Sequence, residues 1–313
     1  MKAKGILKQF GFNTDHEPES IYAFSPVYRV SKEGQEDVII KQTQRPLDKA
    51  RRVMEYLQVL KRNGVGVVTP VHLTTENPQQ IEEEVYVAYP FITGKEYTGT
   101  DKEIYEAGKL LGKIHALSPN ANDYQLSTYE VYDFNFDEVA ESMEAIRKHV
   151  QSYKVEIALD HLERKFLQAV QQQDELKVTG LPHVMTPHDY KANNLIYTPS
   201  PYLIDPDNAI WIPRIFDLAL ALLLFHNELA SAPDKLFTPA QWNLFMKGYS
   251  TFVELTEMEE LYWEMALDHV FLDEVMWLMA DVPEDWEREE QRRLFESIVS
   301  TMKDPSNYIL RRE

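Results

Sequence analysis

A run of polar residues followed by two short apolar segments constrains this chain most strongly. Residues 187–194 read Pro-His-Asp-Tyr-Lys-Ala-Asn-Asn, so Asp189 lies five residues before Asn194. Two apolar runs with β-type residues follow, separated by the turn signal Thr-Pro-Ser-Pro at 198–201, and Asp205 ends the second run. The pattern predicts a loop, a strand, a turn and a strand. Asn194 and Asp205 would flank this hairpin, a geometry that can bring both side chains to one metal ion.

These residue types match the needs of one reaction. Kinase-type phosphoryl transfer uses a carboxylate for the acceptor hydroxyl, and an Asn and an Asp that hold Mg²⁺ against the nucleotide phosphates. Asp189 is then the predicted catalytic base, and Asn194 and Asp205 are the predicted metal ligands. Asp and Asn are also common in surface loops, where they hydrogen-bond their own backbone. On this stretch alone, both interpretations stay open.

A second group of candidate residues lies far upstream. Residues 37–41 predict a strand that ends in Lys41 and resembles the Val-Ala-Ile-Lys strand of kinases, whose Lys contacts the α- and β-phosphates. A helix is predicted over 46–62, with Pro at its first turn, Gly just past its end, and apolar residues at helical spacing, namely Val53, Leu57 and Leu60. On this helix, Glu55 is the candidate partner of Lys41. The alternative is that both charges are solvated on the surface.

The ordered set of motifs resembles the aminoglycoside phosphotransferase and choline kinase group of protein-kinase-like enzymes. Residues 85–94 resemble the strand and hinge that carry the adenine contacts, which the resemblance assigns to Tyr89 and Phe91. Residues 107–117 resemble the first helix of the large lobe. The Phe-Asp-Leu-Ala sequence at 216–219 resembles the start of the helix after the metal loop.

The resemblance covers about residues 25–224 and implies an α+β, bilobal protein-kinase-like fold. Residues 1–92 would form a small, β-rich nucleotide-binding lobe, and residues 93–313 a larger, mostly helical catalytic and acceptor-binding lobe. ATP and Mg²⁺ would be the cofactors, and the γ-phosphoryl group would pass to a hydroxyl of a small molecule. Amino sugars, choline or ethanolamine, homoserine and methylthioribose are all open as acceptors, because pockets vary while the phosphate machinery persists.

The predicted catalytic loop departs from the pattern of the resembled family. Pro187 stands where the family usually has a His that supports the loop, and His188 lies directly beside Asp189 instead. This substitution puts the packing of the loop in doubt more than the reaction. Lys191 stands two residues after the predicted base. It either stabilises the charge of the transferring phosphoryl group or is an exposed loop residue.

The predicted phosphate loop departs as well. Residues 23–30 lie where a Gly-rich turn would cover the phosphates, yet they contain no Gly, so Ser25 is the candidate donor. This loop and Pro187 favour an alternative function, a non-catalytic kinase-like structural or binding protein, such as the kinase-like proteins of bacterial spore coats. The complete set of base, metal ligands, Lys and Glu opposes it, because a scaffold does not need all five residues.

Composition narrows the range of partners. The chain has 32 basic and 51 acidic residues and a formal net charge of −19, which argues against nucleic acid as a partner. Residues 251–313 alone hold 17 acidic and 6 basic residues, which either attract a cationic acceptor or simply keep the surface hydrated. The absence of Cys excludes disulfides and thiol catalysis and fits a cytoplasmic protein. No apolar run is long enough to predict a membrane span.

Two further patterns have two interpretations each. Asp207, two residues after Asp205, is either a carboxylate near the metal or part of an Asp-Pro-Asp-Asn turn. At the end of a helix predicted over 259–280, four residues share helical spacings of three and four: Asp273, Glu274, Trp277 and, one residue past that end, Asp281. They would line one helix face as a cage for a quaternary ammonium, or the same helix would pack into the core.

Overall fold

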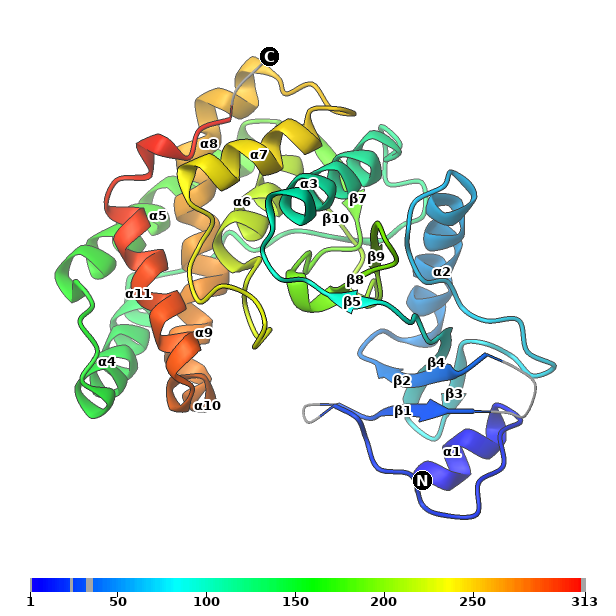
Figure 1. Ribbon diagram of the computed structural model, residues 1–313. Coiled ribbons are helices and arrows are strands. Elements are labelled where there is room, and N and C mark those ends of the chain that lie inside the picture. The colour runs from blue at the N-terminus through cyan, green and yellow to red at the C-terminus, as the bar shows by residue number, and fades with distance from the viewer. Residues whose placement is uncertain (1, 23–24, 32–35, 311–313) are drawn as a thin grey trace. The chain divides into compact units, whose positions relative to one another are not determined.

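The polypeptide forms two compact units. The structure, a computed structural model (Figure 1), describes residues 2–22, 25–31 and 36–310. The first unit comprises Met1–Lys95, Ala121–Leu126 and Ile196–Ala209, and the second comprises Glu96–Asn120, Ser127–Leu195 and Ile210–Glu313. We expected a single boundary after residue 92. The division instead falls at Lys95 and assigns two later segments to the first unit.

An antiparallel sheet forms the centre of the first unit. Its strand order is β1-β2-β4-β3, with bounds β1 (Val27–Val30), β2 (Val38–Thr43), β3 (Gln79–Ile81) and β4 (Glu84–Pro90). The short helix α1 (Ala3–Gln9) covers one face, where Leu7 and Phe10 belong to the same buried cluster as Ile40 and Ala88. The alternate side chains of β2 and β4 therefore point to the opposite face.

Helix α2 (Leu47–Arg62) follows β2 in the same unit. It begins one residue later than predicted, because Pro46 precedes its first turn, whereas Gly64, with φ of 73°, lies just beyond its last residues as the sequence predicted. Its buried side is apolar and consists of Ala50, Val53, Met54, Tyr56, Leu57 and Leu60. Met54 contacts the hydroxyl of Tyr89 on β4, so α2 packs on the face of the sheet that α1 leaves open.

The predicted hairpin is present and belongs mostly to the first unit. It consists of β8 (Leu195–Tyr197) and β9 (Pro201–Leu203), which join β5 (Lys95–Glu96) in a sheet of order β5-β8-β9. Two backbone hydrogen bonds tie Leu203 to the segment after α2: Val68 N–H donates to Leu203 O at 3.0 Å, and Leu203 N–H donates to Gly66 O at 2.8 Å. A Cβ on Gly66 would lie 2.8 Å from Pro201 O, so only Gly permits this approach.

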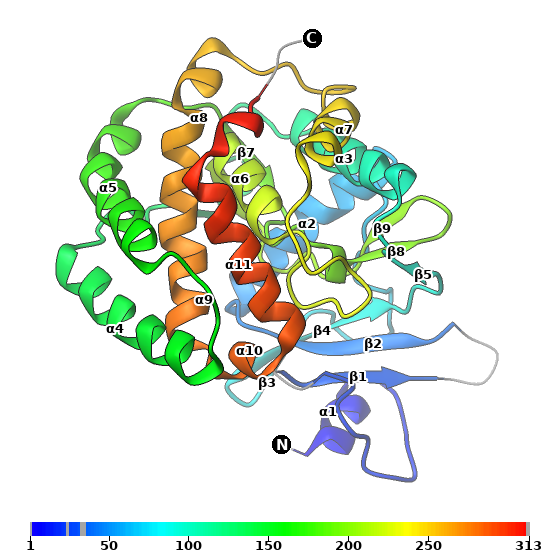
Figure 2. The ribbon, with the colours of Figure 1, turned by 60° about the vertical axis from the view of Figure 1, so that its left-hand side comes forward.

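Helices make up most of the second unit (Figures 1 and 2). Their bounds are α3 (Asp101–Ala116), α4 (Phe136–Tyr153), α5 (Leu159–Val178), α6 (Arg214–Leu224), α7 (Pro239–Tyr249), α8 (Glu257–Val270), α9 (Met276–Asp281), α10 (Pro283–Glu287) and α11 (Glu289–Lys303). Short turns η1 (Ala192–Asn194), η2 (Phe271–Val275) and η3 (Pro305–Asn307) interrupt or flank them. Helix α6 is buried along nearly its whole length. In the described part of the chain, no helix is long and apolar enough to cross a membrane.

A small sheet connects the central helices to the loop 187–194. Its order is β6 (Ser127–Thr128), β10 (Ile210–Pro213) and β7 (His183–Thr186), with β7 and β10 antiparallel. Strand β7 ends at Thr186, where the loop 187–194 begins, and β10 continues directly into α6. The sheet therefore brings the start of this loop close to the helix that carries Asp217.

Helices α3 and α7 pack at very short range because glycines lie at their contact. A Cβ on Gly108 would lie 1.9 Å from Phe245 O, and one on Gly248 would lie 2.1 Å from Tyr105 O. Side chains at these positions would therefore force the two backbones apart. The close packing matters for the site, because α3 supplies both a histidine and a backbone carbonyl that hold the loop 187–194 in place.

Candidate active site

The loop between β7 and β8 has a strained backbone. His188 and Asp189 have φ values of 56° and 49°, in the left-handed region that L-residues with side chains rarely adopt. Such residues are costly and concentrate at functional sites, where surrounding contacts hold them. Asn194 supplies one such contact, because its Nδ2 donates to Asp189 O at 2.9 Å and lies 3.4 Å from Asp189 Oδ2. The Tyr190 hydroxyl supplies another by donating to Ala107 O of α3 at 2.7 Å.

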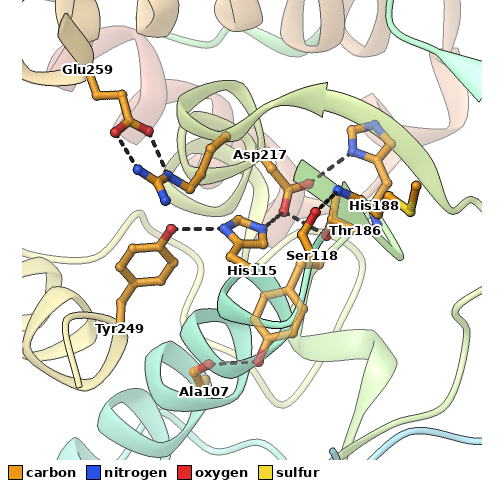
Figure 3. A network of polar contacts seen from close by, with 11 residues as sticks. Ala107, His115, Ser118, Thr186, His188, Asp217, Tyr249 and Glu259 are labelled. Atoms are coloured by element: carbon orange, nitrogen blue, oxygen red, sulfur yellow. Dashed lines mark hydrogen bonds and ion pairs between the residues drawn. The ribbon is translucent and has the colours of Figure 1, made fainter. Parts of the chain in front are cut away.

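The buried carboxylate of Asp217 anchors this loop, and it lies between His188 and His115 (Figure 3). Its oxygens accept from Thr186 Oγ1 at 3.0 Å and pair with His188 Nδ1 at 3.1 Å and His115 Nε2 at 2.9 Å. Burial alone would raise the pKa of Asp217, but the hydrogen bonds from the two histidines outweigh it and lower the pKa. Asp217 therefore stays ionised, and it joins the end of β7 and His188 to His115 of α3.

His188 supports the loop in place of the histidine that the family usually has at the position of Pro187. Its ring reaches Asp217 from the position next to the predicted base. Burial lowers the pKa of His188, but the hydrogen bond and charge of Asp217 raise it above its usual value overall. The departure from the family pattern thus moves the supporting imidazole by one residue and leaves the loop anchored.

Lys191 is held beside Asp189 by a glutamate that the sequence did not reveal. Lys191 Nζ lies 3.4 Å from Asp189 Oδ2 and 2.5 Å from Glu228 Oε2. Glu228 follows α6 and has a left-handed backbone, with φ of 67°. No local pattern marks Glu228, since its role depends only on where the loop after α6 meets Lys191. The side chain of Lys191 is 14% exposed, so it is not a freely solvated loop residue.

A π-helical turn brings the carboxylate of Glu274 close to His188 in the same loop. Turn η2 interrupts the helix that we predicted over 259–280, and the inserted residue changes the direction in which the side chains point. Glu274 Oε1 lies 3.9 Å from His188 Nε2, and Tyr129 donates to Asp273 Oδ2 at 2.6 Å. Trp277 is 52% exposed and points away from the core. Burial raises the pKa of Glu274 to about 7, and the nearby Asp189 also contributes to the increase.

The first unit carries the other predicted residues. Lys41 Nζ forms an ion pair with Asp205 and lies 3.2 Å from Asp207 Oδ2. Burial lowers the pKa of Lys41, but the charges of Asp207 and Asp205 raise it above its usual value overall. Lys41 is therefore charged at neutral pH. The predicted proximity of the strand lysine to the Asp at the end of the hairpin is present in the structure.

Among the ion pairs of the described residues, none joins Lys41 to Glu55, contrary to the expectation. Glu55 is exposed on α2, and both ion-pair partners of Lys41 are the aspartates after the hairpin. The reason is helical geometry, because each residue turns the side chain by about 100°. The residue of α2 that reaches the sheet is Met54, next to Glu55.

Three residues assigned to the nucleotide by resemblance have contacts within the first unit. Tyr89 is 2% exposed and donates its hydroxyl to Asp207, which lies beside Lys41. Phe91 packs its ring against the Arg29 guanidinium, at 3.7 Å. Ser25 accepts at its carbonyl from Ser20 Oγ at 3.0 Å. The remainder of the predicted phosphate loop includes residues 23 and 24, which lie outside the described residues.

The predicted metal ligands are suited to Mg²⁺ by their chemistry. Mg²⁺ prefers oxygen donors, and it commonly uses one or two carboxylates together with phosphate oxygens. The Asp205 side chain is 42% exposed and so can reach a bound ion. Asn194 uses its amide nitrogen to bind Asp189, which leaves the amide oxygen as its donor toward a cation. Asn194 directly precedes β8, and Asp205 follows β9 by two residues.

Comparison with known proteins places these residues in a family. Residues 22–244 match the phosphotransferase enzyme family, so this chain belongs to that family. Comparison with curated proteins gave no significant match.

Solved structures of similar fold include spectinomycin phosphotransferase APH(9)-Ia in complex with ADP and spectinomycin, with 18% identity, 97% of each chain covered and a TM-score of 0.61. A microcompartment-associated aminopropanol kinase has 13% identity, 98% coverage of each chain and a TM-score of 0.66. Choline kinase from Cryptosporidium parvum Iowa II has 15% identity, coverage of 98% of this chain and 97% of its own, and a TM-score of 0.56. The predicted protein-kinase-like fold and the phosphotransferase class are confirmed.

Proposed function

We propose that this enzyme transfers the γ-phosphoryl group of ATP, with Mg²⁺, to a hydroxyl group of a small, cationic molecule. The observation that carries the proposal is the strained loop in which Asp189 lies between Lys191 and Asn194, anchored on the buried Asp217. A structural loop has no need of a carboxylate, an ammonium and an amide held together at the cost of two left-handed residues. Because ATP is a cytoplasmic metabolite, the reaction would take place in the cytoplasm.

The residues have distinct roles in the proposed reaction. Asp189 orients the acceptor hydroxyl and takes its proton as the phosphoryl group transfers in line. Lys191, kept in place by Glu228, lies beside Asp189 and can neutralise charge that develops on the transferring group. Lys41 neutralises the α- and β-phosphates. Asn194 and Asp205 would hold Mg²⁺, which would neutralise the charge of the phosphates when bound.

The charges around Asp189 support a cationic acceptor. Two glutamates lie next to side chains of the loop that carries Asp189. Glu228 pairs with Lys191, and Glu274 lies near His188. Carboxylates that line a partly enclosed site raise the local concentration of cations. An alcohol that bears an ammonium group would place its positive charge near these glutamates while its hydroxyl meets Asp189.

The test begins with the unmodified protein. Calorimetry should detect ATP binding that tightens when Mg²⁺ replaces EDTA, and ADP release should be detected with at least one member of a set of amino alcohols and amino sugars. Neutral polyols of similar size serve as controls for the acceptor. Nucleotide binding without ADP release from any acceptor would favour the non-catalytic alternative, and absence of nucleotide binding would contradict the proposal.

A pH dependence follows from the position of Glu274. Its pKa is raised to about 7 by burial, so the side chain is mostly neutral at pH 6 and mostly anionic at pH 8. For a quaternary ammonium acceptor, whose own charge does not change with pH, KM should fall as the pH rises from 6 to 8. Glu274→Gln should remove this dependence and raise KM at pH 8 by about tenfold, the worth of a favourable charge contact.

Steady-state kinetics between pH 6 and 8 measure the effect. Glu264→Gln is the matched control, because Glu264 lies on the neighbouring α8 and its side chain is 68% exposed. That control should keep the pH profile of the unmodified enzyme. An unchanged profile in Glu274→Gln would place the acceptor cation elsewhere.

A further inference from the structure

Lys41 lies between two carboxylates that differ in their surroundings. Its Nζ atom pairs with Asp205 and lies 3.2 Å from Asp207 Oδ2. The Asp205 side chain is 42% exposed, whereas that of Asp207 is 6% exposed. A single residue, Pro206, separates them. The segment 205–207 therefore presents one carboxylate to solvent and buries the other against the lysine.

The hydroxyl of Tyr89 holds the buried carboxylate. In the register of β2 and β4, Lys41 and Tyr89 are diagonal neighbours on the same face of the sheet. Tyr89 donates to Asp207 Oδ1, and Met54 Sδ of α2 lies 3.2 Å from the same hydroxyl. All three side chains are enclosed, because α2 covers this face. A buried hydrogen bond to an ionised acceptor is strong and directional, so it keeps Asp207 in one orientation toward Lys41.

A lysine that binds nucleotide phosphates needs a partner that stays in place when the nucleotide arrives. Asp205 is not such a partner, because a carboxylate that ligates Mg²⁺ must turn its oxygens to the metal. Glu55 is not one either, because it is exposed on α2. Asp207 meets the requirement, since it is buried, already in contact with Lys41, and held by Tyr89 from the neighbouring strand.

We propose that Asp207 is the positioning residue of Lys41 and that Tyr89 in turn positions Asp207. The inference rests on the proposed function, which gives Lys41 the nucleotide phosphates to bind. This buried trio replaces the ion pair between strand and helix that we expected from Glu55. It leaves Asp205, on the exposed side of the lysine, available as an oxygen ligand for the metal.

Binding of ADP and adenosine to the full-length protein in EDTA tests the inference. In EDTA no metal is bound, so Asp207 cannot affect ADP affinity by ligating a metal ion. Adenosine lacks the phosphates that Lys41 would contact, so its binding does not depend on Lys41. Asp207→Asn should weaken ADP binding by about tenfold, because a charged hydrogen-bonding partner of the lysine is lost. Its affinity for adenosine should equal that of the unmodified protein. A purely structural defect would weaken both ligands.

Three further variants complete the test. Tyr89→Phe removes only the hydroxyl, is the milder change if Asp207→Asn folds poorly, and should also weaken ADP but not adenosine. Glu55→Gln should bind ADP like the unmodified protein. With Lys41→Met as background, Asp207→Asn should cause no further loss of ADP affinity, because the two side chains act as one unit.

Specific outcomes would overturn the inference. One is unchanged ADP affinity in both Asp207→Asn and Tyr89→Phe. Another is a loss that appears only with Mg²⁺, which would make Asp207 a metal ligand. A third is a loss in Glu55→Gln as large as that in Asp207→Asn. If the unmodified protein binds no ADP, the proposed function fails and the inference with it. If that protein binds ADP and the variants match it, the inference alone fails.

Discussion

Replacing Asp189 by Asn is expected to lower kcat for phosphoryl transfer by about a thousandfold, the middle of the roughly hundredfold to ten-thousandfold range for loss of a general base. The carboxylate is the proposed acceptor of the hydroxyl proton, and an amide does not accept that proton at neutral pH. ATP should still bind with nearly unchanged affinity, because Asp189 acts on the acceptor side of the reaction. Steady-state ADP release and calorimetric titration with ATP measure the two quantities separately.

Asn is the suitable replacement because of the backbone at this position. Asp189 has φ of 49°, and Asn tolerates the left-handed region better than Ala does. The bond from Asn194 Nδ2 ends on the backbone oxygen of residue 189 and is therefore kept in the variant. As a control, Asp174→Asn removes the same charge from an exposed position on α5 and should leave kcat unchanged. An unchanged kcat in Asp189→Asn would mean that another group is the base.

Local patterns were sufficient to predict the elements that carry the site. The spacing of Val53, Leu57 and Leu60, together with Pro46 and Gly64, predicted α2 to within one residue of its limits. The turn signal at 198–201 predicted the hairpin of β8 and β9. These features depend on residues within one turn or one strand of each other, which a single sequence displays directly.

Contacts between distant segments could not be predicted in the same way. Whether Met54 or Glu55 faces the sheet depends on the rotation of α2, and one residue changes the direction by about 100°. The Asp-Pro-Asp-Asn segment reads as turn chemistry, yet Asp207 is buried because Tyr89, from a strand far upstream, donates to it. Neither fact has a local signal, since each depends on how β4, α2 and the segment after β9 pack together.

The orientation of the side chains around η2 could not be predicted from the sequence either. The predicted helix over 259–280 exists in outline as α8, η2 and α9, but the π-helical turn changes the direction of the side chains that follow it. Spacings of three and four grouped Glu274 with Trp277, whereas Glu274 lies near His188 and Trp277 is exposed. A π-turn adds a residue without altering composition or apolar periodicity enough to be recognised.

The variant Asp205→Asn is expected to lose the effect of Mg²⁺ on nucleotide binding. In the unmodified protein, ATP should raise the melting temperature more with Mg²⁺ than with EDTA, and in Asp205→Asn this difference should disappear. Turnover should fall by roughly a hundredfold to a thousandfold, because a bound metal contributes several kcal/mol of charge stabilisation and each 1.36 kcal/mol is tenfold in rate. Thermal shift and ADP release measure the two effects.

The Asp205→Asn variant should fold normally, so a loss of the Mg²⁺ effect would not result from a loss of stability. The Asp205 side chain is 42% exposed, and Lys41 keeps Asp207 as a partner when Asp205 becomes neutral. Asp48→Asn is the matched control, since it neutralises a 67% exposed Asp in the same unit and should keep the Mg²⁺ effect. Retention of Mg²⁺-dependent turnover in Asp205→Asn would refute the metal assignment. The three aspartate variants are then distinguished by what they change. Asp205→Asn weakens nucleotide binding only when Mg²⁺ is present, and Asp207→Asn weakens it in EDTA as well. Asp189→Asn lowers turnover but leaves nucleotide binding unchanged.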